Sequence, residues 1–139
     1  MTDKNKIYEG DALKVLKTFP DNFIDCVVTS PPYYNLRDYE TENQIGQEET
    51  PDKYIENLIN IFNEIKRILK NSGSCWINIA DSYSSNKSLY CIPFRLAIRM
   101  TDNGWILRNT IIWKKTNSMP SSASDRFTND FEYLFFFVK

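Results

Sequence analysis

Hydrophobic and polar residues follow one another along the chain in patterns that predict helices between short strands. Residues 23–29 form an apolar run with the β-branched pair Val27 and Val28, and Ser30 and two prolines follow it. Such a run is typical of a buried strand, and the prolines must end its ladder. Residues 51–69 place apolar side chains at spacings of three and four, which predicts an amphipathic helix. Thr50 is its expected cap and Pro51 its first residue.

The remaining segments extend the same pattern. Further strands are predicted at residues 6–9, 74–79, 105–114 and 131–138, and further helices after Asp11 and at residues 92–100. Because strands and helices alternate, the pattern predicts an α/β fold with a mostly parallel sheet flanked by helices. The sequence shows neither an internal repeat nor a linker, so residues 1–139 are expected to form a single domain.

Composition narrows the class of protein. Hydrophobic residues make up 42% of the 139 residues and aromatic residues 14%, which is typical of a folded domain. A formal net charge of −1 gives no overall basic field for nucleic acid. The three cysteines are scattered and histidine is absent, which argues against a metal site. The absence of histidine also excludes histidine acid–base chemistry. Without a signal-like N-terminus or a long apolar run, a cytoplasmic protein with reduced thiols and no membrane span is expected.

The end of the strand at residues 23–29 combines residue types that suit a binding site. In an open α/β sheet, ligands bind at the carboxyl ends of the strands. Pro31 and Pro32 are rigid and leave carbonyl groups free of local donors, while Ser30 adds a hydroxyl. Tyr33 offers a flat face on which a base can stack. Together these groups would hold a planar amine toward an electrophile, although a packed Pro–Pro turn is the simpler alternative.

Residues 29–33 resemble the catalytic motif of the amino-methylating DNA methyltransferases, in particular the permuted group with a Thr-Ser-Pro-Pro-Tyr motif. Residues 7–21, 35–39, 76–83, 111–126 and Glu132 resemble other segments of this family in the same order, so the resemblance covers nearly the whole chain. The resemblance implies part of the Rossmann-like fold of methyltransferases that use S-adenosylmethionine as the methyl donor. The implied reaction is methylation of an exocyclic amino group of a base in DNA.

The resemblance also implies roles for individual residues. Ser30, Pro31, Pro32 and Tyr33 would be catalytic: Tyr33 stacks on a flipped-out base, while Ser30 and the Pro31 carbonyl hold its amine. Asp11, together with Thr29 and Ser30, would bind the cofactor. Asp11 would accept from the adenine amino group, although a helix cap alone explains its position as well. Serine at the first position of the motif resembles cytosine-N4 enzymes, and adenine N6 is the alternative target.

Contacts to DNA are expected from Arg37, Asp81, Trp113, Lys115 and Arg126. Arg37 lies in the irregular segment 34–50, and Arg126 lies in the serine-rich segment 115–129. Long loops of this kind are often functional. A solvated loop is the alternative for Arg37, and a cap or turn is the alternative for Asp81.

Glycine is scarce where the family needs it. The chain has four glycines, and no two lie close enough to form a glycine-rich loop for the methionine end of the cofactor. In the permuted group the catalytic motif precedes the cofactor motif, so we expect a partial catalytic domain without the cofactor-motif strands, inactive alone. The edge this leaves open should recruit a complementary half, a partner subunit or a second copy. A non-catalytic DNA-docking or assembly subunit and an RNA or protein amino-methylating enzyme are the alternatives.

Overall fold

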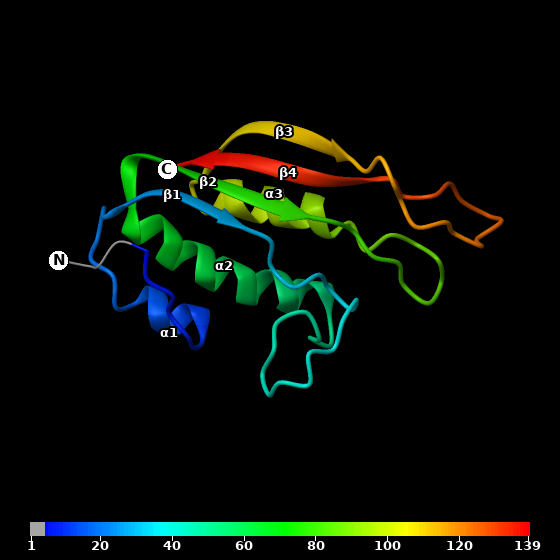
Figure 1. Ribbon diagram of the computed structural model, residues 1–139, viewed down its shortest axis with the longest axis horizontal. Helices are drawn as coiled ribbons and strands as arrows, with labels where there is room; N and C mark the ends of the chain where they lie inside the picture. Colours follow the sequence, from blue (N-terminus) through cyan, green and yellow to red (C-terminus); the bar gives the residue numbers. More distant parts are fainter. Residues whose placement is uncertain (1–4) are drawn as a thin grey trace.

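The computed structural model describes residues 5–139, and its elements alternate between helices and strands. In chain order they are α1 (Ala12–Leu16), β1 (Ile24–Thr29), α2 (Pro51–Ile68), β2 (Leu69–Ile79), α3 (Ile92–Asp102), β3 (Ile106–Lys114) and β4 (Phe131–Val138). Figure 1 shows the three labelled helices on one side of the sheet. The predicted α/β class is therefore confirmed. Within residues 5–139, none of the helices is both long and apolar enough to cross a bilayer.

The sheet has the order β1-β2-β4-β3. β1 and β2 are parallel, while β4 is antiparallel to both of its neighbours. Three of the four strands therefore run in one direction, as predicted, but two of the three ladders are antiparallel, so the sheet is mixed. The reason is the connection between β3 and β4. Residues 115–130 contain no crossover helix, so the chain reverses and β4 enters between β2 and β3.

The strand predicted at residues 6–9 is absent from the structure. This segment is irregular, and Ile7 is 95% exposed. A strand needs a neighbour for its backbone groups, and no strand of the described chain pairs with this segment. The helix that follows is present, with Asp11 as its cap.

The hydrophobic core lies between the sheet and helices α2 and α3. Cys75, Ile77 and Ile79 alternate along β2 and are fully buried against the helices. The apolar stripe predicted for α2 supplies the opposite wall, and β4 adds further aromatic side chains. The buried residues of α2 and β4 include Tyr54, Leu58, Phe62, Ile65, Phe135 and Phe137.

The opposite face of the sheet, which we call the open face, carries Val28, Trp76, Phe136 and Trp113. Trp76 stacks on Phe136 with ring centroids 4.3 Å apart. Val28 is 76% exposed and Trp113 57% exposed, and Figure 1 shows no helix of the described chain over this face. β1 forms one edge of the sheet. An apolar face and a free edge of this kind are features that another polypeptide can cover.

Replacing Ile77 with alanine tests the buried face of β2. The side chain is fully buried, so Ile77→Ala should lower the free energy of unfolding by about 2–5 kcal/mol in urea titrations. The matched control is Ile112→Ala on β3, where the side chain is 54% exposed and the expected loss is about 1 kcal/mol or less. Equal losses in the two variants would contradict the assigned core.

Candidate functional site

The loop that follows β1 is fixed from below by α2. Pro31 is buried at the carboxyl end of β1, while Ser30 is exposed. The hydroxyl of the fully buried Tyr54 donates to the Pro32 carbonyl over 2.7 Å. Within residues 5–139, no hydrogen bond reaches the Pro31 carbonyl. One proline carbonyl therefore holds the loop in place, and the other is left as an acceptor for a ligand.

Gly46 holds the long segment 34–50 against this loop. Its φ of +106° favours glycine, and a Cβ added there would lie 3.0 Å from the Tyr33 carbonyl oxygen. The Asn35 amide donates to the Gly46 carbonyl over 2.7 Å and closes the contact. The segment therefore folds back over residues 32 and 33 through direct contact between backbones.

Tyr33 is held at its hydroxyl group by residues of β2 and β4. Its hydroxyl donates to Glu132 Oε2 on β4 over 2.6 Å, lies 3.2 Å from Asn78 Oδ1 on β2, and accepts from Ser30 Oγ over 3.4 Å. Burial and then the neighbouring Glu132 raise the pKa of Tyr33 to about 12, so the phenol is protonated at neutral pH. The ring is thus fixed at its hydroxyl end.

Glu132 is itself paired with Lys115, which directly follows β3. The ammonium contacts Glu132 Oε1, while Tyr33 contacts the other oxygen. Burial pushes the pKa of Glu132 upward, but hydrogen bonds from Lys115 and Tyr33 outweigh it and leave the pKa below its ordinary value. The carboxylate is therefore ionised and has a partner at each oxygen.

Two cavities meet at residues 30–32. The first, which we call the Tyr33 cavity, measures about 370 Å³. It is lined by Ser30, Pro31, Pro32, Tyr33, Leu36, Arg37, Tyr39, Lys115 and Glu132. The second, the Asp11 cavity, measures about 540 Å³ and includes Asp11, Thr29, Ser30, Pro31 and Pro32 above apolar residues of α2. The residues predicted to be catalytic and those predicted to bind a cofactor thus line two adjoining spaces with a shared wall.

A smaller cavity of about 230 Å³ lies beside the Tyr33 cavity and shares Tyr33, Leu36, Lys115 and Glu132 with it. Asp81 reaches this space, but its Oδ1 accepts from the Ile92 amide over 3.1 Å and from the Ser82 amide. Burial raises the pKa of Asp81, and its Oδ2 is buried without a partner in the described chain. The geometry of Asp81 supports the cap considered as an alternative.

The structure does not bring every predicted DNA contact into these cavities. Arg37 and Lys115 line the Tyr33 cavity. Trp113 instead lies on the open face of β3. The Arg126 guanidinium stacks over Tyr83, 3.8 Å from the ring centroid, in a separate cavity of about 180 Å³.

Asn78 and the contact of Glu132 with Tyr33 were missed by the sequence analysis. They lie 45 and 99 positions from Tyr33 along the chain. No local pattern marks such a contact, and the only signal was that Glu132 and the segment 76–83, which contains Asn78, resemble the family.

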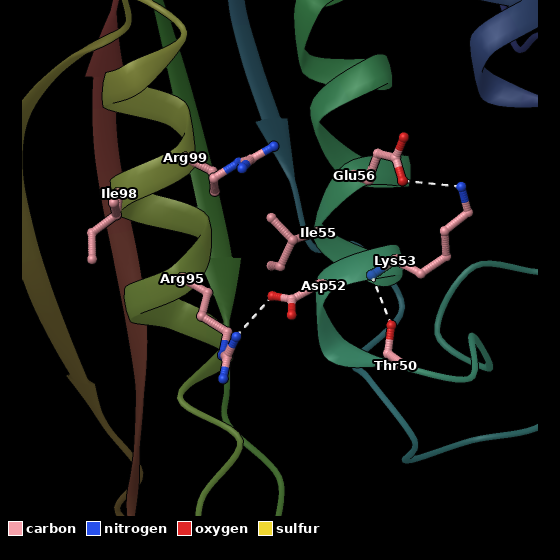
Figure 2. A pocket seen from close by; sticks show the side chains of 8 residues that line it. All are labelled: Thr50, Asp52, Lys53, Ile55, Glu56, Arg95, Ile98 and Arg99. Carbon is pink, nitrogen blue, oxygen red and sulfur yellow. Dashed lines mark hydrogen bonds and ion pairs between the residues drawn. The ribbon is translucent and has the colours of Figure 1, made fainter.

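Another cavity, of about 560 Å³, lies between α2 and α3 and is shown in Figure 2. An ion pair of 2.8 Å between Arg95 and Asp52 crosses it. It shares no residue with the cavities around the Pro–Pro loop. Within the described residues, no group of three or more histidine, cysteine or acidic side chains is arranged to hold a metal ion.

Comparison with known proteins shows to which family the chain belongs. A family model described as DNA methylase, N6_N4_Mtase, matches residues 24–139. The chain belongs to this DNA methylase family. The match begins at the first residue of β1 and includes all four strands. It also includes residues 30–32, which line both the Tyr33 cavity and the Asp11 cavity.

The chain is similar to parts of longer curated proteins. It is 46% identical to the type II methyltransferase M.MwoI of Methanothermobacter wolfeii, over 98% of this chain and 21% of that protein. It is 42% identical to M.SfiI of Streptomyces fimbriatus and 41% identical to M.XycI of Xanthomonas campestris pv. cyanopsidis, in each case over 96% of this chain. These matches cover 35% of M.SfiI and 54% of M.XycI, so the chain spans about half of the relatives' length or less.

Solved structures agree on the fold. The PvuII DNA methyltransferase (cytosine-N4-specific) superposes with a TM-score of 0.78 at 23% identity, over 94% of this chain and 48% of that one. A Thermus thermophilus protein solved in complex with S-adenosyl-L-methionine superposes with a TM-score of 0.73 at 27% identity, over 94% and 53% of the two chains. The sheet and helices described above thus have the fold of part of these methyltransferases.

The bond from Tyr54 to the Pro32 carbonyl gives a test of how the loop is held. Tyr54→Phe keeps the buried ring but leaves the carbonyl without its donor, so the free energy of unfolding should fall by about 1–3 kcal/mol in urea titrations. Tyr8→Phe is the control, because Tyr8 is 40% exposed and its hydroxyl has no bond within residues 5–139. A loss as small as that of the control would show that the bond does not hold the loop.

Proposed function

We propose that this chain carries the catalytic residues of an S-adenosylmethionine-dependent enzyme that methylates an exocyclic amino group of a base in DNA. One observation carries the proposal. The Tyr33 cavity and the Asp11 cavity adjoin at Ser30, Pro31 and Pro32. A methyl donor in one and an amine in the other would meet at this shared wall.

The size and lining of the two cavities suit such ligands. Their volumes of about 370 and 540 Å³ lie in the range of small-molecule sites. In the Tyr33 cavity, the aromatic ring provides a stacking surface for a base taken out of the duplex. Arg37 lines the same cavity and forms no ion pair within the described residues, so it is free to contact a phosphate.

Ser30 and Pro31 supply the polar contacts that methylation of an amine requires. Both the Ser30 hydroxyl oxygen and the Pro31 carbonyl can accept an N–H of the amine. Two such bonds fix the plane of the amino group and direct the nitrogen lone pair toward the Asp11 cavity. With S-adenosylmethionine bound, the nitrogen would form its bond to the methyl carbon as the sulfur–methyl bond breaks, so that neutral S-adenosylhomocysteine leaves. The proton lost from the nitrogen would then pass to solvent. No covalent bond to the protein is needed, and Cys26 lies on the exposed edge strand without a role.

The residues of the Asp11 cavity fit one part of S-adenosylmethionine, which supplies an electrophilic methyl group when bound. The Asp11 carboxylate can accept from hydroxyl or amino groups while it caps α1, and Ile61, Phe62 and Ile65 provide an apolar floor. Within this cavity the one glycine is Gly10, so the chain offers no glycine-rich cradle for the methionine end. We infer that a second polypeptide segment supplies this cradle and covers the open face.

Cytosine N4 is the favoured target, with adenine N6 as the second candidate. The serine at position 30 supports cytosine, in accord with the cytosine-N4-specific enzyme to which the fold is similar. A non-catalytic docking subunit is the competing function, and it is supported by the absent glycine loop. The open carbonyl of Pro31 and the network around Tyr33 favour the catalytic role, because a docking surface needs neither.

Methylation of DNA tests the catalytic assignment. In the complete enzyme, Ser30→Ala and Tyr33→Ala should each lower kcat at least about 100-fold, because each removes a group that orients the amine. Ser72→Ala, at an exposed position outside every cavity described above, is the control. Transfer of a labelled methyl group gives the rate, and mass spectrometry of the digested DNA distinguishes N4-methylcytosine from N6-methyladenine. Wild-type rates in both variants would refute the site.

Calorimetric titration of S-adenosylmethionine tests the need for a second segment. The chain alone should show no measurable binding, and binding should appear when the complementary segment is present. The physical reason is the missing glycine cradle. Tight binding by the chain alone would contradict this part of the proposal.

A further inference from the structure

A chain of polar contacts leads away from Ser30 and ends at a carboxylate. Ser30 Oγ lies 3.4 Å from the Tyr33 hydroxyl, and that hydroxyl lies 2.6 Å from Glu132 Oε2. A phenol has one proton, and Tyr33 donates it in the short hydrogen bond to the ionised Glu132. The remaining lone pairs of the Tyr33 oxygen therefore accept, and the Ser30 hydroxyl donates to them.

Glu132 sets the direction of these bonds because an ionised carboxylate can only accept. Its side chain is 14% exposed, and Lys115 on its other oxygen keeps it charged. Asn78, on the strand between β1 and β4, lies against the same hydroxyl at 3.2 Å. The contact between Tyr33 and Glu132 joins the loop after β1 to β4, with which β1 does not pair. It is therefore a tertiary constraint on the loop.

The direction matters for what Ser30 can offer to a ligand. A serine hydroxyl has one proton and two lone pairs. When its proton points to Tyr33, as in the 3.4 Å contact, Ser30 presents acceptor lone pairs to the Tyr33 cavity. An amino group donates N–H bonds, so this polarity matches an amine and opposes a carbonyl oxygen at the same position.

We propose that Glu132, held ionised by Lys115, is a positioning residue that fixes the Tyr33 ring and makes Ser30 an acceptor toward the amine of the target base. This inference rests on the proposed function and adds residues that act through Tyr33. Its contribution is orientation: the carboxylate contacts neither the amine nor the methyl group.

A double-mutant cycle in the complete enzyme tests the proposal. Glu132→Gln introduces an amide that can donate to Tyr33 and reverse the chain, and Tyr33→Phe keeps the ring but removes its hydroxyl. Each change should lower kcat for DNA methylation about 10–100-fold with little change in the KM for DNA, since a misplaced reacting group costs rate more than binding. The double variant should be no slower than the slower single variant, because both break one chain. Losses that multiply would overturn the proposal.

Glu64→Gln on α2 is the matched control for charge and burial. Glu64 is ion-paired with Arg67 and its side chain is 23% exposed, yet it lines none of the cavities around the Pro–Pro loop. Its kcat should equal that of the wild type. Thermal melting of every variant identifies loss of activity through unfolding, and a folded Glu132→Gln enzyme with wild-type kcat would refute the positioning role.

Titration of the Tyr33 phenol tests the contact without any reaction. With ¹³C-labelled tyrosine and Tyr33→Phe to assign the signal, NMR of this chain should give a pKa near 12, raised by burial and then by Glu132. Glu132→Gln should lower it, because the nearby negative charge is removed, and an unchanged pKa would refute the contact. A wild-type enzyme that fails to methylate DNA would refute the proposed function instead, while this titration would still report on the contact.

Discussion

The stop of β1 at two prolines is the constraint on which the rest of the site depends. Because neither proline can donate to the ladder, the chain must leave the sheet at its carboxyl end. There, the two proline carbonyls differ. The Pro32 carbonyl accepts from the Tyr54 hydroxyl of α2, while the Pro31 carbonyl has no donor in the described chain. The core helix thus holds the loop rigidly and leaves one acceptor open.

The loop is held between elements that do not pair with one another. α2 holds it through Tyr54, segment 34–50 presses on it at Gly46, and β4 reaches it through Glu132. The result is a wall with a cavity on each side. Transfer of a group between two ligands requires that the reacting atoms lie close together while each ligand keeps its own contacts, and residues 30–32 line both cavities.

Charge around the site is largely compensated within the chain. Lys115 pairs with Glu132, and Lys87 pairs with Asp125. The formal net charge is −1, while Arg37 and Arg126 each line a cavity and form no ion pair within residues 5–139, so both can contact phosphate. The uncovered open face and the missing glycine loop agree with the proposal that a further segment is needed to bind the cofactor.

The sequence by itself determined the elements with strong local signals: the end of β1 before the two prolines, the start of α2 at Pro51 after its cap Thr50, and a strand at residues 74–79. Steric and periodic rules act over a few residues, so these features can be seen in a short window. Only the tertiary structure decided that β4 lies antiparallel between β2 and β3, that residues 6–9 have no partner, and that Glu132 reaches Tyr33 across 99 positions. Strand order brings distant residues together, and it follows from how the whole chain packs, which no local pattern encodes.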